Sequence, residues 1–299
     1  MQAGSYLKLS VGVAVVTIAL KGAAWWWTGS VALAADALES LVNLAGALFA
    51  LAMLTLAAQP PDAEHPYGHH KAEYFSGGFE GVLIFAAGLG IAVGAAARLL
   101  EPQPLEQFGV GVALTVVSTA MNGGLALAML RKARALRSIA LEADARHLIT
   151  DVWTSAGVLV GLAGVHLTGW QWLDPLAALV VAANVLREGV HLLGRAGSGL
   201  MDEALDPASL ARIEAALAGF AAHNVRFDHL STRTAGQRCF VELHMHAPAD
   251  WTLGRAAAMR GEVERALVAA LPGLRASIQL LPTDIEPLDD EAPRPVSPR

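Results

Sequence analysis

The sequence predicts an α-helical membrane protein, a bundle of six transmembrane helices followed by a small α+β cytoplasmic domain. Of the 299 residues, 54% are hydrophobic and only 16% are charged, whereas about a quarter of the residues of soluble domains are charged. Six apolar stretches are long enough to cross about 30 Å of hydrocarbon as helices. They cover roughly residues 7–28, 33–58, 77–99, 108–130, 141–168 and 173–194. We therefore expect residues 1–200 to form the membrane domain.

The pattern of the chain changes after about Asp206. Two segments have helical periodicity, the first behind an Asp-Pro start, and three short segments have the composition of strands. Their order predicts an αββαβ, ferredoxin-like domain over residues 201–284. Residues 285–299 are acidic and rich in proline, which predicts a disordered tail. The segments are, in order, DPASLARIEAALAGF, VRFDHLSTR, RCFVELHMHA, TLGRAAAMRGEVERALVAAL and ASIQLLP.

Basic residues in the short loops predict the orientation of the spans, because Lys and Arg are retained on the cytoplasmic side. The loops at 59–72 and 131–137 and the end of the sixth span carry Lys, Arg or His. The alternate loops contain no Lys or Arg; they are residues 28–30, 101–107 and 168–172. We expect both termini to be cytoplasmic in a multi-pass protein of a bacterial inner (plasma) membrane.

Several classes of protein do not fit the motifs of this chain. It contains no nucleotide-binding glycine loop, no P-loop and no serine-nucleophile elbow. It also lacks HExxH, so an intramembrane metalloenzyme is a weak alternative. The net charge of −6 gives no reason to expect a nucleic-acid partner. We expect no enzyme, no catalytic residue and no prosthetic group.

Polar residues in the second and fifth spans predict a cation site inside the membrane. Asp36, Glu39 and Asn43 share one face of the second span, and His147 and Asp151 are one helical turn apart in the fifth. Such groups cost at least about 2.5–3.5 kcal/mol at bilayer depth, so they usually face a bundle interior and have a function there. With both helices packed together, the i, i+4 pairs give a pocket of four ligands.

Charge favours a divalent cation in this pocket. Ionised Glu39 and Asp151 with neutral Asn43 and His147 give a formal charge of about −2, and an empty pocket would take up protons instead. Metal and protons can therefore exchange. Asp36 is a possible ligand, a carboxylate that orients a ligand, or a residue near the outer interface. Glu80 stands alone in the third span, which favours a structural or proton-path role.

The loop between the second and third spans predicts another metal site. Asp62, His65 and His69 have the spacing that lets one turn gather a carboxylate and two imidazoles around a zinc-like ion. Pro66 and Gly68 between them favour the turn. A polar surface loop without metal is the alternative.

Taken together, the motifs resemble those of the cation diffusion facilitator family, which carries divalent metals out of the cytoplasm in exchange for protons. The resemblance covers almost the whole chain and rests on four motifs: ADALESLVN, HPYGHHKAEYFS, ADARHLITDVWTSAG and LMDEALD. It implies a homodimer joined partly by the cytoplasmic domains. It also implies a charge interlock between Lys71 and Asp202. The implied metal sites are Glu39, Asn43, His147 and Asp151 for transport, and Asp62, His65 and His69 in the loop.

The chain departs from the family pattern at two places. Glu39 and Asn43 stand where many zinc-selective members have His and Asp or two Asp, and oxygen donors also suit harder ions. The cargo could therefore be zinc, iron, manganese or cobalt. The final strand has Gln279 and Leu281 where members with a cytoplasmic zinc cluster keep His and Asp. His244 and His246 are weak metal candidates, and we expect them to be ordinary surface residues.

The sequence thus predicts a proton-coupled antiporter that exports divalent transition-metal cations by alternating access. Its expected partners are the lipid bilayer, metal ions, protons and a second copy of the chain. A monovalent cation/proton antiporter on the same scaffold is one alternative, because the site is rich in oxygen. A metal-sensing membrane protein without transport is another.

Overall fold

The structure is a computed structural model that describes residues 3–101, 103, 105–136, 139–283 and 285. The chain divides into two compact units. The first unit contains Met1–Ala52 and Ser76–Gly194, and the second contains Met53–Phe75 and Arg195–Arg299. The loop after the second helix therefore belongs to the same unit as the C-terminal domain. The predicted disordered tail lies outside the described residues except for Ile285.

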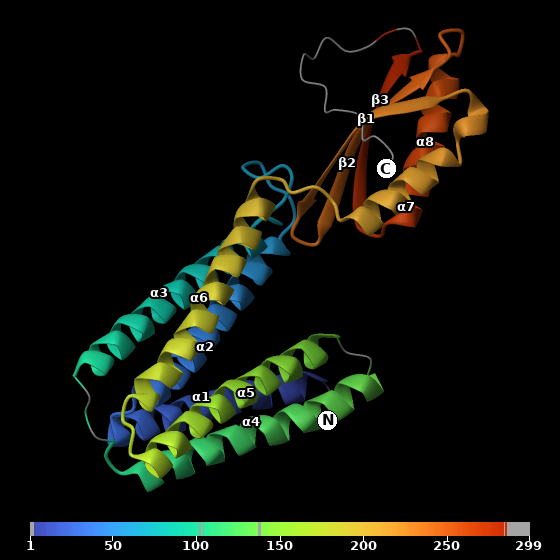
Figure 1. Ribbon diagram of the computed structural model, residues 1–299. Helices are drawn as coiled ribbons and strands as arrows, with labels where there is room; N and C mark the ends of the chain where they lie inside the picture. Colours follow the sequence, from blue (N-terminus) through green and yellow to red (C-terminus); the bar gives the residue numbers. More distant parts are fainter. Residues whose placement is uncertain (1–2, 102, 104, 137–138, 284, 286–299) are drawn as a thin grey trace. The chain divides into compact units, whose positions relative to one another are not determined.

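Six helices account for the N-terminal two thirds of the chain (Figure 1). All six are long and apolar enough to cross a membrane, which confirms the predicted spans. Several extend beyond the apolar stretches because their flanking residues are also good helix formers, as in the Arg-Lys-Ala-Arg-Ala run that continues the fourth helix. The helices are α1 (Ala3–Thr28), α2 (Val31–Ala57), α3 (Ala72–Leu100), α4 (Phe108–Leu136), α5 (Ile139–Thr168) and α6 (Leu173–Leu200).

Asp174 at the start of α6 caps the start of α2. Its carboxylate accepts hydrogen bonds from the backbone N–H groups of Val31 and Ala32 and from the hydroxyl of Ser30. These N–H groups have no partner within α2, and an acidic group at a helix N-terminus is favourable. Asp174 is 2% exposed. It joins the ends of two helices that are far apart in the sequence.

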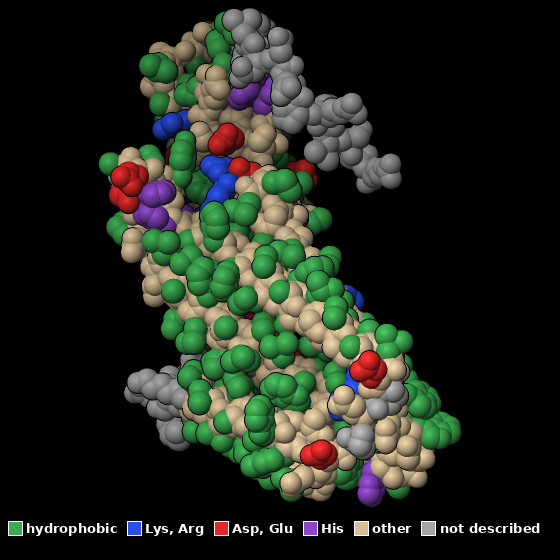
Figure 2. Space-filling view, turned by 90° about the vertical axis from the view of Figure 1, so that its left-hand side faces the viewer, with side chains coloured by type: hydrophobic (Ala, Val, Ile, Leu, Met, Phe, Trp, Pro, Cys, Tyr) green, Lys and Arg blue, Asp and Glu red, His purple; other side chains and the backbone are tan. Residues whose placement is uncertain are grey.

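Glycines allow α3 and α6 to pack closely. A Cβ atom added at Gly189 would lie 2.8 Å from the backbone nitrogen of Phe85, and one at Gly88 would lie 2.9 Å from the Leu186 side chain. Small residues let the backbones of membrane helices approach closely. This close packing matters because no hydrophobic effect drives the association of helices within lipid. The outer surface of the helices is largely hydrophobic, as Figure 2 shows for one face. Val160, for example, is 73% exposed, which suits contact with lipid.

The C-terminal part confirms the predicted αββαβ order. Strand β2 pairs with β1 in antiparallel and with β3 in parallel orientation. Val241, Leu243 and Met245 alternate along β2 and are buried in one core with residues of both helices. The helices cover one face of the sheet (Figure 1). The elements are α7 (Pro207–Ala218), the 3₁₀ turn η1 (Ala221–His223), β1 (Arg226–Ala235), β2 (Arg238–Ala247), α8 (Leu253–Ala270) and β3 (Leu274–Pro282).

Candidate cation site

The four predicted ligands line one cavity inside the helical unit. The cavity has a volume of about 420 Å³ and lies among α2, α3, α5 and α6. Helix α2 supplies Glu39 and Asn43, and α5 supplies His147 and Asp151; the spacing of four residues puts each pair on one helix face. The other polar residues that line it are Glu80, Thr150, Asn184 and Glu188. The structure therefore brings the two predicted pairs into one space.

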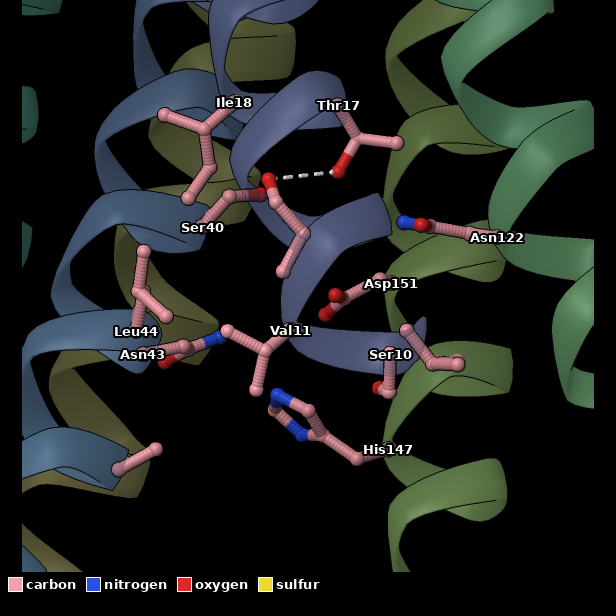
Figure 3. A pocket seen from close by; sticks show the side chains of 13 residues that line it. Ser10, Val11, Thr17, Ile18, Ser40, Asn43, Leu44, Asn122, His147 and Asp151 are labelled. Atoms are coloured by element: carbon pink, nitrogen blue, oxygen red, sulfur yellow. Dashed lines mark hydrogen bonds between the residues drawn. The ribbon is translucent and has the colours of Figure 1, made fainter. Parts of the chain in front are cut away.

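One carboxylate oxygen in this cavity has no partner. Oε2 of Glu39 is buried and makes no hydrogen bond within the described part of the chain. Such an oxygen is costly unless a proton or a cation meets it. Asn43, His147 and Asp151 also line a neighbouring pocket, which Figure 3 shows. Glu39, His147 and Asp151 do not form a tight cluster such as those found at two other places among the described residues.

Glu80 does not stand alone, contrary to the expectation from the sequence. It lines the same cavity as His147 of α5 and Glu188 of α6. Glu188 lies on α6, next to the basic residue Arg187. A partner on another helix cannot be read from the spacing within one helix. The cavity thus carries four carboxylates, Glu39, Glu80, Asp151 and Glu188.

Lys21 is a buried charge that the sequence analysis did not identify. Its ammonium lies 2.8 Å from Oδ1 of Asp36 and donates a hydrogen bond of 2.9 Å to the hydroxyl of Ser40. The Asp36 carboxylate also accepts from the hydroxyl of Ser155 on α5, at 3.0 and 2.9 Å. Lys21 and Asp36 are both 1% exposed. Asp36 is therefore a deeply buried partner in an ion pair.

The three predicted loop residues come together in the second unit. Oδ1 of Asp62 lies 3.3 Å from Nδ1 of His65, and Oδ2 lies 3.4 Å from Nε2 of His69. One ligand atom from each residue lies within 4.8 Å of the others. The backbone N–H of His65 donates to Asp62 and holds the pKa of its carboxyl below the ordinary value. A carboxylate and two imidazoles in this arrangement suit a zinc-like cation.

Asp202 pairs with two basic side chains, Lys71 and Arg233. The family resemblance implies only the pair with Lys71. Nζ of Lys71 is 3.0 Å from Oδ1 of Asp202, and a guanidinium nitrogen of Arg233 is 3.2 Å from the same oxygen. The hydrogen bond from Lys71 is the main reason that the pKa of Asp202 lies below its ordinary value. The contact of Arg233 was not predicted, because its strand β1 and Asp202, just after α6, come together only in the folded chain.

His246 is not the surface residue that the sequence predicts. It is 0% exposed, and its Nε2 lies 3.0 Å from Oδ1 of Asp228. The ring also contacts the carbonyl of Pro282 on β3. Alternation along the strand puts His244 and His246 on the face opposite Leu243, where His246 contacts the Asp228 carboxylate of β1 and the Pro282 carbonyl of β3.

A second three-residue group results on this sheet. Ligand atoms of Asp228, His244 and His246 lie within 4.8 Å of one another. Nδ1 of His244 is 3.6 Å from the Asp228 carboxylate and has no hydrogen bond within the described residues. Gln279 pairs with His244 and Leu281 with His246, so β3 adds no carboxylate or imidazole there. The group is therefore built from β1 and β2 alone.

A membrane-buried cavity with carboxylate, amide and imidazole groups and an appended α+β domain define a class of cation transporters. The chain matches the cation efflux transmembrane domain over residues 7–201 and the cytoplasmic domain of cation efflux proteins over residues 205–283. It belongs to the cation efflux family, also called cation diffusion facilitators. It is therefore a multi-pass membrane transporter and not an enzyme.

Similar proteins cover almost the full length of the chain. A protein of Synechocystis sp. named "Uncharacterized transporter sll1263" is 48% identical over 285 residues, which are 95% of this chain and 90% of that protein. The cation-efflux pump FieF of Klebsiella pneumoniae is 30% identical over 296 residues, with 95% of this chain and 96% of the pump covered. A solved structure of CzrB is 37% identical over 26% of this chain and 96% of that chain, with a TM-score of 0.25.

Proposed function

We propose that the protein exports divalent transition-metal cations from the cytoplasm in exchange for protons. The transport site consists of Glu39 and Asn43 on α2 with His147 and Asp151 on α5. The observation that supports this most is the shared cavity, in which a buried Glu39 oxygen has no hydrogen-bond partner among the described residues. In that cavity a cation or a proton removes the cost of the bare oxygen.

The buried ion pair supports a formal charge of −2 on the four proposed ligands, whereas Glu80 and Glu188 line the same cavity outside this ligand set. Lys21 neutralises Asp36, so this carboxylate adds no net charge beside the ligands. Glu39 and Asp151 then supply the charge that a divalent cation cancels. Because their carboxylates and His147 must lose protons to bind metal, cation binding releases protons and protonation releases the cation. Three oxygen donors and one imidazole fit zinc, iron, manganese or cobalt.

Export follows if the site opens to each side of the membrane in turn. On the cytoplasmic side the cation displaces protons; on the outer side protons compete for His147 and the carboxylates. The loop residues Asp62, His65 and His69 would gather cations on the cytoplasmic side. Basic residues in alternate loops support cytoplasmic termini.

We further propose a homodimer that is held partly by the cytoplasmic domains. The match to the cytoplasmic domain of cation efflux proteins supports this assembly. Residues 1–200 would form the membrane domain and residues 201–284 the dimerisation domain. The interlock of Asp202 with Lys71, here joined by Arg233, would tie the loop to the start of that second domain.

Asp151→Asn tests the proposed activity with little change in side-chain volume. In everted vesicles, wild-type protein should couple manganese or zinc uptake to proton movement, and Asp151→Asn should abolish both because one ionisable ligand is lost. Glu106→Gln, which removes an exposed carboxylate outside the cavity, is the control and should behave like wild type.

Two outcomes would contradict the proposal. Full activity of Asp151→Asn would remove this residue from the site. Sodium flux without manganese or zinc flux would favour a monovalent antiporter, and absence of any flux from folded protein would favour a sensor.

A further inference from the structure

A second cavity shares three lining residues with the proposed transport site. It has a volume of about 280 Å³ and lies among α1, α2, α4 and α5. Three proposed ligands, Asn43, His147 and Asp151, line both cavities. The remaining polar lining of the second cavity carries no further charge and consists of Ser10, Thr17, Ser40 and Asn122. A cation held by the shared residues therefore has a neutral, polar space beside it.

The side-chain oxygen of Asn122 lacks a hydrogen bond to any described residue in this space. The residue is 3% exposed, and its Oδ1 is buried without a hydrogen bond in the described part of the chain. The hydroxyls of Thr17 and Ser40, in contrast, donate to the carbonyls of Ala14 and Asp36 in their own helices. Figure 3 shows the Asn122 side chain extending from α4 toward the cavity, on the side of Thr17 and Asp151.

A buried amide oxygen without a hydrogen bond among the described residues, in the middle of a long apolar helix, requires an explanation. Asn122 is far from both ends of α4, so it caps no helix terminus. Rotation about the last side-chain bond exchanges the positions of its oxygen and nitrogen without other movement. The cavity is large enough for several waters at about 30 Å³ each. An amide oxygen in such a place can contact a cation directly or through one water.

We propose that Asn122 is a further binding residue of the transport site and favours six-coordinate cations over zinc. This inference rests on the proposed function. Zinc is satisfied by four ligands in tetrahedral geometry, which Glu39, Asn43, His147 and Asp151 can complete. Manganese prefers six ligands, mostly oxygens. The amide oxygen of Asn122 and water in the second cavity supply the additional oxygens on the side that the first four residues leave open.

Cation affinity of the purified full-length protein tests the role of Asn122. Titration calorimetry with manganese and with zinc would be done on wild type, Asn122→Leu and Asn122→Asp. The binding signal that Asp151→Asn removes is assigned to the membrane site. Asn122→Leu should weaken manganese binding about tenfold, the low end for loss of a supporting metal contact, and change zinc binding less than about threefold. Asn122→Asp should restore manganese binding, because its carboxylate oxygen replaces the amide oxygen.

Thr17→Val is the matched control from the same cavity. Its hydroxyl already bonds within α1, so the ratio of manganese to zinc affinity should not change. An unchanged ratio in Asn122→Leu, or equal weakening of both metals, would overturn the inference. If Asn122→Leu does not fold, Asn122→Ala gives the same comparison. If wild type showed no cation binding beyond that of Asp151→Asn, the result would instead contradict the proposed function itself.

Discussion

Lys21 and Asp36 form an ion pair at a depth where single charges are costly. Their side chains are 1% and 2% exposed, and the pair is completed by the hydroxyls of Ser40 and Ser155. These contacts join α1, α2 and α5 one turn away from Glu39 and Asp151. Asp36, which the sequence left as a possible ligand, is paired with Lys21, and we propose that it acts as a counter-ion that orients the helices of the site.

Removal of Lys21 alone should destabilise the protein strongly. Lys21→Met leaves the Asp36 carboxylate buried without a cation, which costs about 3–5 kcal/mol when one partner of a buried pair is lost. The double variant Lys21→Met/Asp36→Leu should recover most of this loss, because no charge remains to be compensated. Thermal unfolding in detergent measures both. Equal midpoints for Lys21→Met and wild type would show that the pair does not form.

The four proposed ligands could be predicted from the sequence, but the residues that surround them on other helices could not. Spacing of four residues identified the pairs on α2 and α5, because helix geometry alone sets which residues share a face. Lys21 lies on a different helix from Asp36, and Asn122 and Glu188 lie on different helices from the proposed ligands whose cavities they line. Their roles depend on how the helices are rotated against one another, which no pattern within one helix contains.

At the scale of elements, the packing of α3 on α6 forms one wall of the cavity. Glu80 comes from α3 and Glu188 from α6. The residue next to Glu188, Gly189, lies against the backbone of Phe85 with no room for a Cβ atom. The distance between these helices therefore sets how close the two glutamates stand.

Gly189→Ala should push the two helices apart. The added methyl group would lie 2.8 Å from a backbone nitrogen, which cannot move aside as a side chain can, so we expect a loss of about 1–3 kcal/mol from overpacking. Gly194→Ala on the same helix is the control, because nothing lies within 4 Å of its Cβ position. Thermal midpoints of both variants give the comparison. A loss of stability as large for Gly194→Ala would refute close packing as the cause.

The order of elements in the second domain was predictable, whereas the environment of its histidines was not. Leu243 and Met245 lie in the core, as the period-two alternation of apolar residues in RCFVELHMHA indicates. This alternation could not show that Asp228 on β1 and Pro282 on β3 cover His246. The register of β1 shifts between Asp228 and Ser231, and such an irregularity is not visible in the sequence pattern.

At the scale of the whole molecule, the two units divide the tasks of the transporter. The helical unit contains the carboxylate-rich cavity, and the second unit contains both groups whose ligand atoms already lie within 4.8 Å of one another. Acidic and imidazole groups in the membrane cavity are more widely spaced. In the proposed mechanism, a cation in this cavity draws its ligands together and displaces their protons, which would couple binding to a change in the helices.

Proton release on cation binding tests this account most directly. Manganese would be titrated into weakly buffered, purified full-length protein in which Asp62→Ala and His69→Ala remove the loop site, while bound metal and pH are both followed. The account predicts that each cation bound in the membrane releases protons, and that adding Glu39→Gln and Asp151→Asn eliminates both signals. Undiminished cation binding and proton release in that variant would contradict a transport site built on these two carboxylates.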